Sequence, residues 1–304
     1  MRTIFASILF LSLCACAFAQ SELMPETGSL GLTVNARMTG SVNSKLKRDG
    51  TTYDQIDTSS AEIGLTQTIR LNKGNSLRLS LERQRTTIDQ DLNADDPVVP
   101  LPDELNSLSA AVAYTHIASP AWIFTGRVGA GSHVTDTGLL SEGWAANAMA
   151  MTIYNRSKTL TYMFGLVYGS NMEDLRILPI FGLNWRPSPK WSIAVGFPKT
   201  GATYHFNKAL SLGLGFSGGG GSYYVKTDPR SHPSASSQPL GDTWLQQRDI
   251  RLGFDANWKI NQTVRISGAI GQVLYRKFKY VDRDFELKSD NFAPFVSVAG
   301  LISF

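Results

Sequence analysis

The chain has 304 residues and a formal net charge of +4 at neutral pH, with 29 Lys and Arg against 25 Asp and Glu. A charge excess this small does not indicate a nucleic-acid-binding protein. The two cysteines, Cys14 and Cys16, both lie close to the N-terminus. Because no cysteine follows Cys16, the rest of the chain cannot form a disulfide, a thiolate metal site or a cysteine nucleophile.

The N-terminus has the features of an export signal. A positive charge at Arg2 precedes a short apolar run over residues 4–13, and residues 17–19 (Ala-Phe-Ala) match a cleavage site for signal peptidase. The apolar run is too short to span a bilayer as a stable helix. We predict a signal peptide over residues 1–19 and a single mature domain over residues 20–304.

A lipoprotein anchor is the alternative interpretation of this segment. It would place an acyl chain on Cys16, but Cys14 two positions earlier makes a poor lipoprotein signal. We therefore favour cleavage after Ala19.

Apolar and polar residues alternate with a period of two along most of the remaining chain. The clearest stretches are residues 30–38, 77–82, 159–169, 209–217 and 250–258. This pattern predicts β-strands with one apolar and one polar face. No comparable stretch has the spacing of an amphipathic helix.

The segments between the strands alternate in length. Short turns at 72–75, 155–158, 187–190, 207–208 and 260–262 are interspersed with longer polar segments at 43–56, 89–104, 134–142 and 227–246. Tight periplasmic turns and long external loops are typical of transmembrane barrels. We predict an all-β fold, a transmembrane antiparallel up-and-down β-barrel of about 14 strands, or about 12 if the hairpin at 191–206 does not fully span.

Aromatic residues mark the expected membrane boundary. Trp122, Trp185, Trp191 and Trp258 each lie beside a predicted short turn, where an interfacial girdle is expected. The last strand ends on Phe304, and a terminal aromatic after an alternating strand resembles the assembly signal of outer-membrane barrels. We expect the bacterial outer membrane as location, and outer-membrane lipid and the barrel assembly machinery as partners, without nucleic acid.

One central stretch carries a more specific resemblance. Residues 178–225 contain Asn184-Trp185, Trp191, Phe197-Pro198, Tyr204 and a run of glycines. This pattern resembles an uncharacterised family of bacterial outer-membrane β-barrels, a domain of unknown function. By size and general pattern the chain also resembles porin-like and hydrophobic-compound transport barrels. The resemblance implies fold and location, and it carries no substrate or catalytic residue.

Charged residues on the polar faces are the candidate functional residues. Strand parity points them into the lumen, where they either brace the wall as ion pairs or line a polar path. The candidates are Arg37, Glu62, Arg70, Arg78, Glu82, Arg127, Arg251, Asp255 and Arg265.

Two other patterns suggest chemistry and are given little weight. Residues 213–218 match G-x-G-x-x-G, but more strand follows where a nucleotide site needs a helix, so Gly218–Gly221 are expected to let a strand bend. The four histidines, His116, His133, His205 and His232, lack neighbours at metal-ligand spacing. We expect no cofactor, no metal and no catalysis.

We therefore predict a passive or substrate-selective pore or transporter for small solutes. The alternatives are a structural or adhesive barrel whose external loops bind a partner and, with less support, an outer-membrane hydrolase with a catalytic group at the outer rim.

Overall fold

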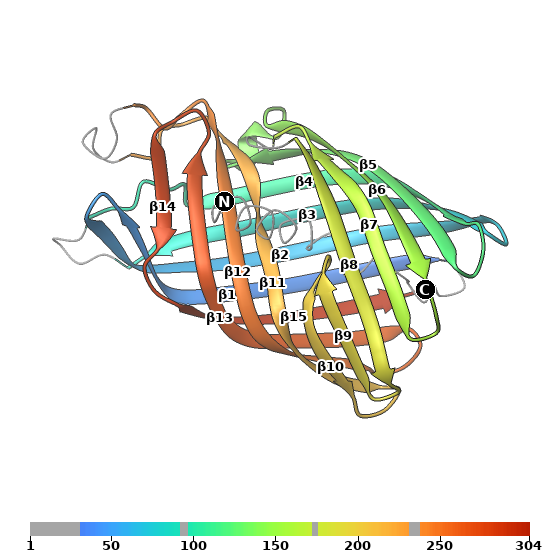
Figure 1. Ribbon diagram of the computed structural model, residues 1–304. Helices are drawn as coiled ribbons and strands as arrows, with labels where there is room; N and C mark the ends of the chain where they lie inside the picture. The colour runs from blue at the N-terminus through green and yellow to red at the C-terminus, as the bar shows by residue number, and fades with distance from the viewer. Residues whose placement is uncertain (1–30, 92–96, 172–175, 231–237) are drawn as a thin grey trace.

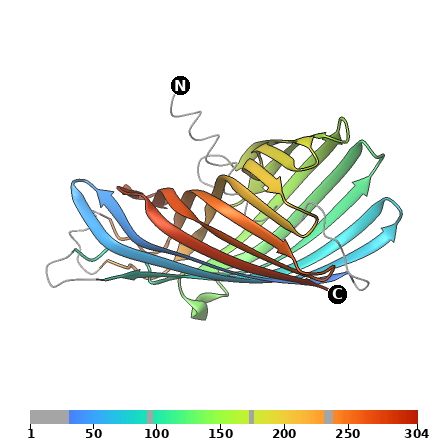
Figure 2. The same cartoon turned by 90° about the horizontal axis from the view of Figure 1, so that it is seen from below.

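The computed structural model describes residues 31–91, 97–171, 176–230 and 238–304, which form a closed antiparallel β-barrel (Figures 1 and 2). The predicted signal peptide and His232 lie outside the described residues. The elements are β1 (Leu32–Arg48), β2 (Thr51–Asn72), β3 (Asn75–Gln90), β4 (Glu104–Ile117), β5 (Trp122–Val134), the 3-10 helix η1 (Thr137–Leu139), β6 (Trp144–Asn155), β7 (Leu160–Gly169), β8 (Ile177–Ser188), β9 (Trp191–Gly196), β10 (Thr200–His205), β11 (Leu210–Val225), β12 (Thr243–Lys259), β13 (Val264–Tyr280), β14 (Phe285–Ser289) and β15 (Ala293–Ser303). Over the described part of the chain, no helix is long and apolar enough to cross a membrane.

Fourteen strands close the ring. β1 to β13 pair in sequence order, β13 pairs with β15, and β15 pairs with β1. The short β14 lies in line with β15 and pairs with the far ends of β13 and β1. The predicted antiparallel barrel of about 14 strands is therefore confirmed, and the 191–206 hairpin is part of the ring as β9 and β10.

The two ends of the barrel differ in their connections. The turns at 73–74, 118–121, 156–159, 189–190, 206–209 and 260–263 lie at the end where the C-terminus is found, which we call the short-turn end. The other end, which carries β14 and the longer connections, is the long-loop end (Figure 1). The predicted separation of short and long connections is thus observed for most of the ring; the β1–β2 and β9–β10 connections are short and lie away from the short-turn end.

The predicted polar loop over residues 43–56 is wrong. β1 and β2 instead continue as a hairpin that turns only at Asp49 and Gly50, whose φ angles are 47° and 87°. Positive φ at both central residues is the geometry of the two-residue turns that join antiparallel strands. The polar composition concealed a strand because Leu46, Tyr53 and Ile56 are the only apolar residues within 43–56, and these three are buried.

The long-loop end is filled by a hydrophobic core, which we call the outer core. It comprises Leu46, Tyr53, Ile56, Ile88, Val99, Leu101, Leu105, Tyr223, Val225, Leu240, Leu245, Phe278, Tyr280, Phe285 and Leu287, each at most 7% exposed. Val99 and Leu101 come from the 89–104 segment, and the phenol of Tyr280 donates to the carbonyl oxygen of Pro100 at 2.8 Å. Residues 99–101 therefore fold inward and help to fill the mouth of the barrel.

A run of glycines redirects β11 as it approaches the outer core. Gly220 has a φ of 131°, and a Cβ atom at this position would lie 2.1 Å from the carbonyl oxygen of Gln247. Only glycine fits such a backbone and such a close approach. Beyond the run, Tyr224 pairs with Val134 of β5, on the opposite side of the ring order. The expectation that Gly218–Gly221 bend a strand is consistent with this path.

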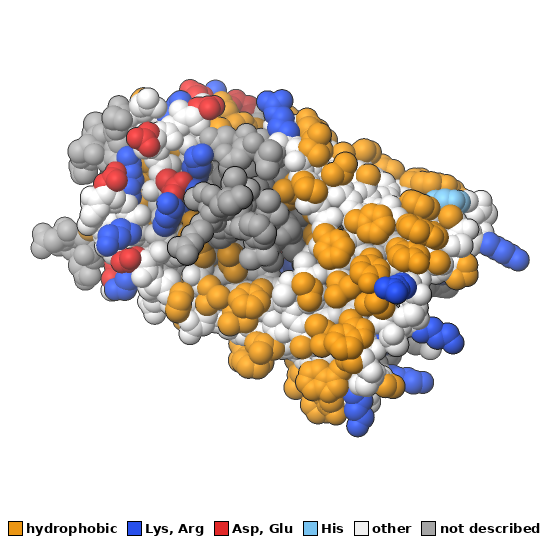
Figure 3. Space-filling view, viewed as in Figure 1, with side chains coloured by type: hydrophobic (Ala, Val, Ile, Leu, Met, Phe, Trp, Pro, Cys, Tyr) orange, Lys and Arg blue, Asp and Glu red, His pale blue; other side chains and the backbone are white. Residues whose placement is uncertain are grey.

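The exterior carries an apolar belt. Outward residues such as Met38, Val128 and Ile270 are 70%, 61% and 61% exposed, while their chain neighbours face the lumen. In Figure 3, hydrophobic side chains cover the part of the surface formed by β5 to β10. Charged side chains of both signs gather at the long-loop end instead. Such a belt is what a barrel presents to hydrocarbon.

Candidate functional site: the barrel lumen

Several of the predicted lumen charges are held in ion pairs. Arg37 and Glu62 approach to 3.8 Å between guanidinium and carboxylate, and Asp255 accepts from the Lys199 ammonium at 2.6 Å. The Arg251 guanidinium donates to Asp249 at 2.9 Å. These pairs brace the wall.

The other predicted lumen residues differ in burial. Arg78, Glu82 and Arg127 are half-buried. Arg70 and Arg265 lie near the short-turn end and are exposed. The lumenal position of these residues and their role in solute passage stay predictions.

Sequence reasoning missed the most buried ion pair. Arg276 of β13 is 1% exposed and donates to both carboxylate oxygens of Asp249 at 3.0 Å and to the Ser44 hydroxyl at 3.2 Å. A register shift between β12 and β13 beside Ile250 changes which residues of β13 face inward. Strict alternation counted from Arg265 would therefore place Arg276 on the outer face. Asp249 was missed because the strand was expected to begin one residue later. A charged pair this buried is tolerated only when its geometry and hydrogen bonds are complete.

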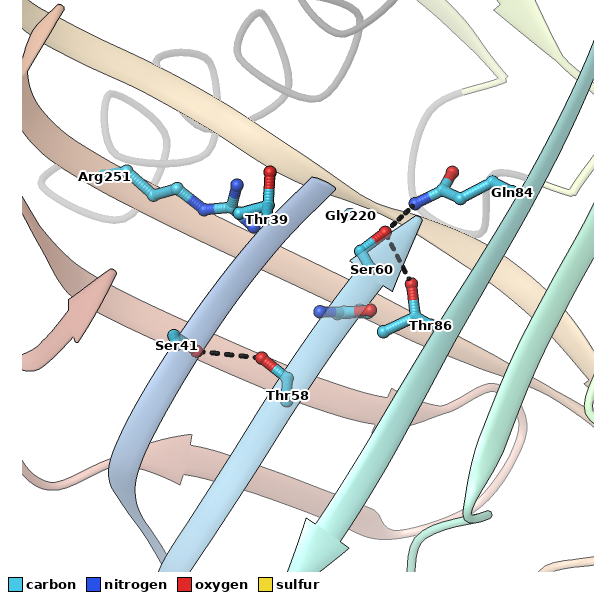
Figure 4. Close-up of a pocket in the computed structure, with 9 residues that line it drawn as sticks. Thr39, Ser41, Thr58, Ser60, Gln84, Thr86, Gly220 and Arg251 are labelled. Atoms are coloured by element: carbon cyan, nitrogen blue, oxygen red, sulfur yellow. Dashed lines mark hydrogen bonds between the residues drawn. The ribbon is translucent and has the colours of Figure 1, made fainter. Parts of the chain in front are cut away.

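A polar pocket lies between the inner faces of β1–β3 and the β11–β12 ribbon (Figure 4). Its hydroxyls are linked to one another: Ser41 and Thr58 lie 2.8 Å apart, and Ser60 accepts from Gln84 at 3.1 Å and from Thr86 at 3.0 Å. The remaining lining residues are Thr39, Gly220, Gln247 and Arg251. The space open to water-sized molecules is about 30 Å³, which is room for about two waters.

Part of the inner face of β5–β8 is apolar, in contrast to the polar pocket. A cluster that we call the lumenal apolar patch consists of Ile123, Met151, Ile153, Met163, Leu178, Ile180 and Phe197, with Met149, Val167 and Ile250 packed against it. Parity placed Met163 and Val167 inward, but the extent of this apolar face was not expected from the sequence. Methionine fills irregular apolar space and contacts aromatic rings favourably.

The barrel wall is interrupted beside this patch. The ladder between β8 and β9 ends at Gly182↔Gly196, and that between β10 and β11 ends at Thr200↔Phe216. Towards the long-loop end, β8 continues to Ile177 and β11 to Val225, and no ladder joins these two stretches in the described residues. We call this interruption the wall break; in Figure 1 the short hairpin lies only between the lower parts of β8 and β11.

Proline marks the edge of the wall break. The carbonyl oxygen of Phe181 accepts from the Phe197 amide at 2.7 Å, so the backbone groups of Phe181 point towards β9. Since these groups alternate along a strand, those of Pro179 and Ile177 point into the break. Proline is confined to such edge positions because it has no N–H to donate.

The four predicted interfacial tryptophans lie outside the barrel at its short-turn end. Trp122, Trp185, Trp191 and Trp258 are 38%, 46%, 46% and 53% exposed. Neighbouring aromatics extend the group: Trp122 stacks on Tyr154 with ring centroids 4.5 Å apart, and Trp191 meets Tyr204 at 5.1 Å. This arrangement is what an interfacial girdle requires, and its contact with a bilayer stays a prediction.

Comparison with known proteins identifies the family. The family model described as "Domain of unknown function (DUF6268)" matches residues 42–293, most of the chain. The chain belongs to this family. The predicted membership of an uncharacterised barrel family is thereby confirmed. No curated protein matches the sequence.

Solved structures similar to this DUF6268 barrel are outer-membrane channels. The ΔS2 mutant of TodX, a monoaromatic hydrocarbon channel, aligns with a TM-score of 0.53 and 12% identity over 91% of each chain. The ΔS2S3 mutant of TodX aligns with a TM-score of 0.52 and 12% identity, and the alignment covers 95% of this chain and 94% of the TodX chain. An outer-membrane channel from Pseudomonas putida F1 aligns with a TM-score of 0.49 and 13% identity, and the alignment covers 93% of this chain and 98% of that channel. At this identity the likeness to TodX establishes the fold alone.

The DUF6268 barrel offers little support for the hydrolase alternative. The Ser192 hydroxyl lies 3.1 Å from Nε2 of His205, but no carboxylate hydrogen-bonds this ring in the described residues. His133 packs edge-on against Tyr223, with centroids 6.3 Å apart. Within the same residues, no group of three His, Cys, Asp or Glu side chains is arranged to hold a metal ion. A serine nucleophile needs a base that is itself oriented by a third group.

Proposed function

We propose that this protein is a selective outer-membrane transport barrel, without catalysis, that passes small apolar solutes sideways through the wall break. The family, the barrel fold and the apolar belt support a location in the bacterial outer membrane. There it would contact outer-membrane lipid and be inserted by the barrel assembly machinery through β15. TodX is named as a channel for monoaromatic hydrocarbons, and solutes of that class match the lumenal apolar patch.

The path along the barrel axis is obstructed. Fifteen nearly buried side chains of the outer core pack together at the long-loop end. A hydrated ion or sugar would have to displace packed core residues to pass. These features favour a selective route over an open aqueous pore, which was the simpler form of the sequence-based prediction.

The lateral path through the wall break is lined by apolar side chains. This apolar lining is the observation that carries the proposal. Leu178 and Ile180 of the lumenal apolar patch lie on β8 at the wall break, while their outward neighbours Ile177 and Phe181 are 57% and 56% exposed in the apolar belt. Apolar surface therefore continues from the outside of β8 to its inside across one strand edge. A small apolar molecule could follow it without crossing a polar layer.

An open strand edge is costly in hydrocarbon, because each unsatisfied backbone group costs several kcal/mol there. Non-helical backbone at membrane depth is tolerated where it lines a passage that admits water. Pro179 removes one N–H from this edge, and glycines form the facing part of β11. A passage through the wall gives this otherwise unfavourable edge a function.

Uptake measurements test the proposal. Cells that make the protein should take up radiolabelled toluene faster than matched cells without it, because lipopolysaccharide otherwise slows apolar solutes. Ile180→Trp adds bulk to the lumenal apolar patch and should reduce the gain. Phe181→Trp adds bulk to the adjacent outward position and serves as the matched control. Both variants are first checked for heat-resistant mobility in detergent electrophoresis.

Two results would contradict the proposal. Equal uptake with and without the protein would exclude toluene transport, and equal uptake by the two tryptophan variants would exclude the route. Planar-bilayer recording provides an independent measurement. Stepwise ion currents whose weak anion preference is reversed by Arg78→Glu with Arg127→Glu would establish an aqueous pore instead.

A further inference from the structure

The charged side chains in the turns and strand ends of the short-turn end are all of one sign. Its turns and strand ends carry Lys73, Arg156, Lys158, Arg186, Lys190 and Lys208, all exposed. None of these six residues takes part in an ion pair in the described part of the structure. No Asp or Glu occurs within residues 68–78, 152–162, 184–194 or 203–213, which surround them. We call these six residues the basic rim.

The long-loop end has a different charge distribution. Acidic and basic residues are mixed there, and many are paired, as Lys45 is with Asp54 at 2.5 Å and Lys288 with Glu286 at 2.5 Å. Figure 3 shows both signs at that end and only Lys and Arg at the other. The single sign of the basic rim is therefore a property of one end of the barrel.

The basic rim is spread around the barrel. Its members come from the β2–β3, β6–β7, β8–β9 and β10–β11 connections, which lie in order round the ring. A single protein partner would need a compact patch on one side. A lipid leaflet, in contrast, surrounds the whole perimeter.

The neighbouring tryptophans fix the depth of the basic rim. Trp185 precedes Arg186 and Trp191 follows Lys190 in the sequence, and both indoles face outward. Interfacial tryptophans lie at the level of the lipid headgroups. Since adjacent strand residues are about 3.3 Å apart, the cations next to these indoles reach the phosphate layer.

We propose that the basic rim binds the phosphates of anionic phospholipids in the leaflet next to the short-turn end. In the orientation expected from the loop lengths, this is the periplasmic leaflet. Each Lys or Arg near an anionic surface contributes about 1 kcal/mol, equivalent to about a fivefold preference for a lipid that contacts one cation. The basic rim would hold the barrel at a defined depth and tilt in the membrane, whichever solute the barrel passes.

Fluorescence of the tryptophans near the basic rim can measure which lipids contact this end of the barrel. Trp144 and Trp244, at the long-loop end, are replaced by Phe so that the remaining indoles report the short-turn end. The protein is refolded into vesicles of phosphatidylcholine and phosphatidylglycerol in which either lipid is brominated, and quenching gives their relative occupancy. We expect a several-fold preference for phosphatidylglycerol that disappears in 1 M KCl, where the Debye length is about 3 Å.

Charge-neutralising variants provide the comparison. Replacing all six basic-rim residues by Gln should abolish the preference. The matched control, Lys45→Gln with Lys288→Gln, removes two paired cations at the long-loop end and should leave it unchanged. Equal quenching by the two brominated lipids in the unmutated barrel would overturn the proposal. So would loss of the preference on adding inorganic phosphate at matched ionic strength, because this would indicate a site for free phosphate.

Discussion

Gly220 provides the most direct test of how β11 reaches the outer core. We predict that Gly220→Ala destabilises the barrel. The φ of 131° is a region that alanine rarely adopts, and the new Cβ would lie 2.1 Å from the Gln247 carbonyl oxygen and 2.8 Å from its carbon. Strain of this kind costs about 1–3 kcal/mol. Overpacking against backbone that cannot move away costs about 1–3 kcal/mol more.

Two other glycines serve as controls that separate the cost of backbone strain from the cost of the steric clash. At Gly50 the φ is 87° and nothing lies within 4 Å, so Gly50→Ala measures strain without a clash. At Gly126 the space is also open and φ is not positive, so Gly126→Ala should change stability by at most about 1 kcal/mol. Urea unfolding of the protein in lipid vesicles, followed by tryptophan fluorescence, gives the three free energies. A Gly220→Ala loss no larger than that of Gly50→Ala would refute the close approach of β11 to β12.

Three further predictions concern other parts of the barrel. Arg276→Met should destabilise by up to about 3–5 kcal/mol because it removes two hydrogen bonds from the buried Asp249 carboxylate and leaves Arg251 as its remaining guanidinium partner. Restoration of stability by adding Asp249→Leu would separate this cause from lost packing. Phe304→Asp should leave export intact but reduce insertion, and normal amounts of heat-resistant barrel would show that the terminal aromatic is an ordinary strand end. Burial raises the pKa of the Glu286 carboxyl, but hydrogen bonds from Lys277 and Lys288 outweigh it and hold the pKa below its ordinary value. The stabilisation is therefore present above the unfolded pKa and is lost as pH falls through the folded pKa. Glu286→Gln should cost about 1 kcal/mol or less at pH 7 and progressively less on acidification; a loss that does not shrink on acidification would contradict this assignment.

Features that repeat along the chain could be predicted from the sequence. Period-two alternation, short turns and tryptophans beside them were enough for the barrel and its strand number. These features are local, because each strand residue faces either the lumen or the outside. The glycine run also has a local cause, since a backbone with φ of 131° requires glycine.

Features that depend on contact between distant strands could not be predicted. Arg276 lies beyond a register shift, which reverses the faces of a strand without a signal in residue types. Tyr53 and Ile56 lie in a polar stretch, and their burial depends on packing against residues of β12–β14 that are far away in sequence. The wall break depends on where β11 leaves β10, although Pro179 indicates in retrospect that β8 has an edge there.

The seam between β1 and β15 has a consequence for the way the barrel forms. Nine residue pairs join these strands, from Thr33↔Ser303 to Ser41↔Phe295, and the two hydroxyls at its end are 270 positions apart in the chain. Bringing such distant segments together costs about 5 kcal/mol in chain entropy, and this loss precedes the first hydrogen bond of the seam. Until the seam forms, both edges of a fourteen-stranded sheet present backbone groups that hydrocarbon cannot satisfy. A partly closed sheet is therefore unfavourable in the bilayer, and strand pairing and membrane insertion are coupled into one cooperative event that waits for the most distant contact in the chain.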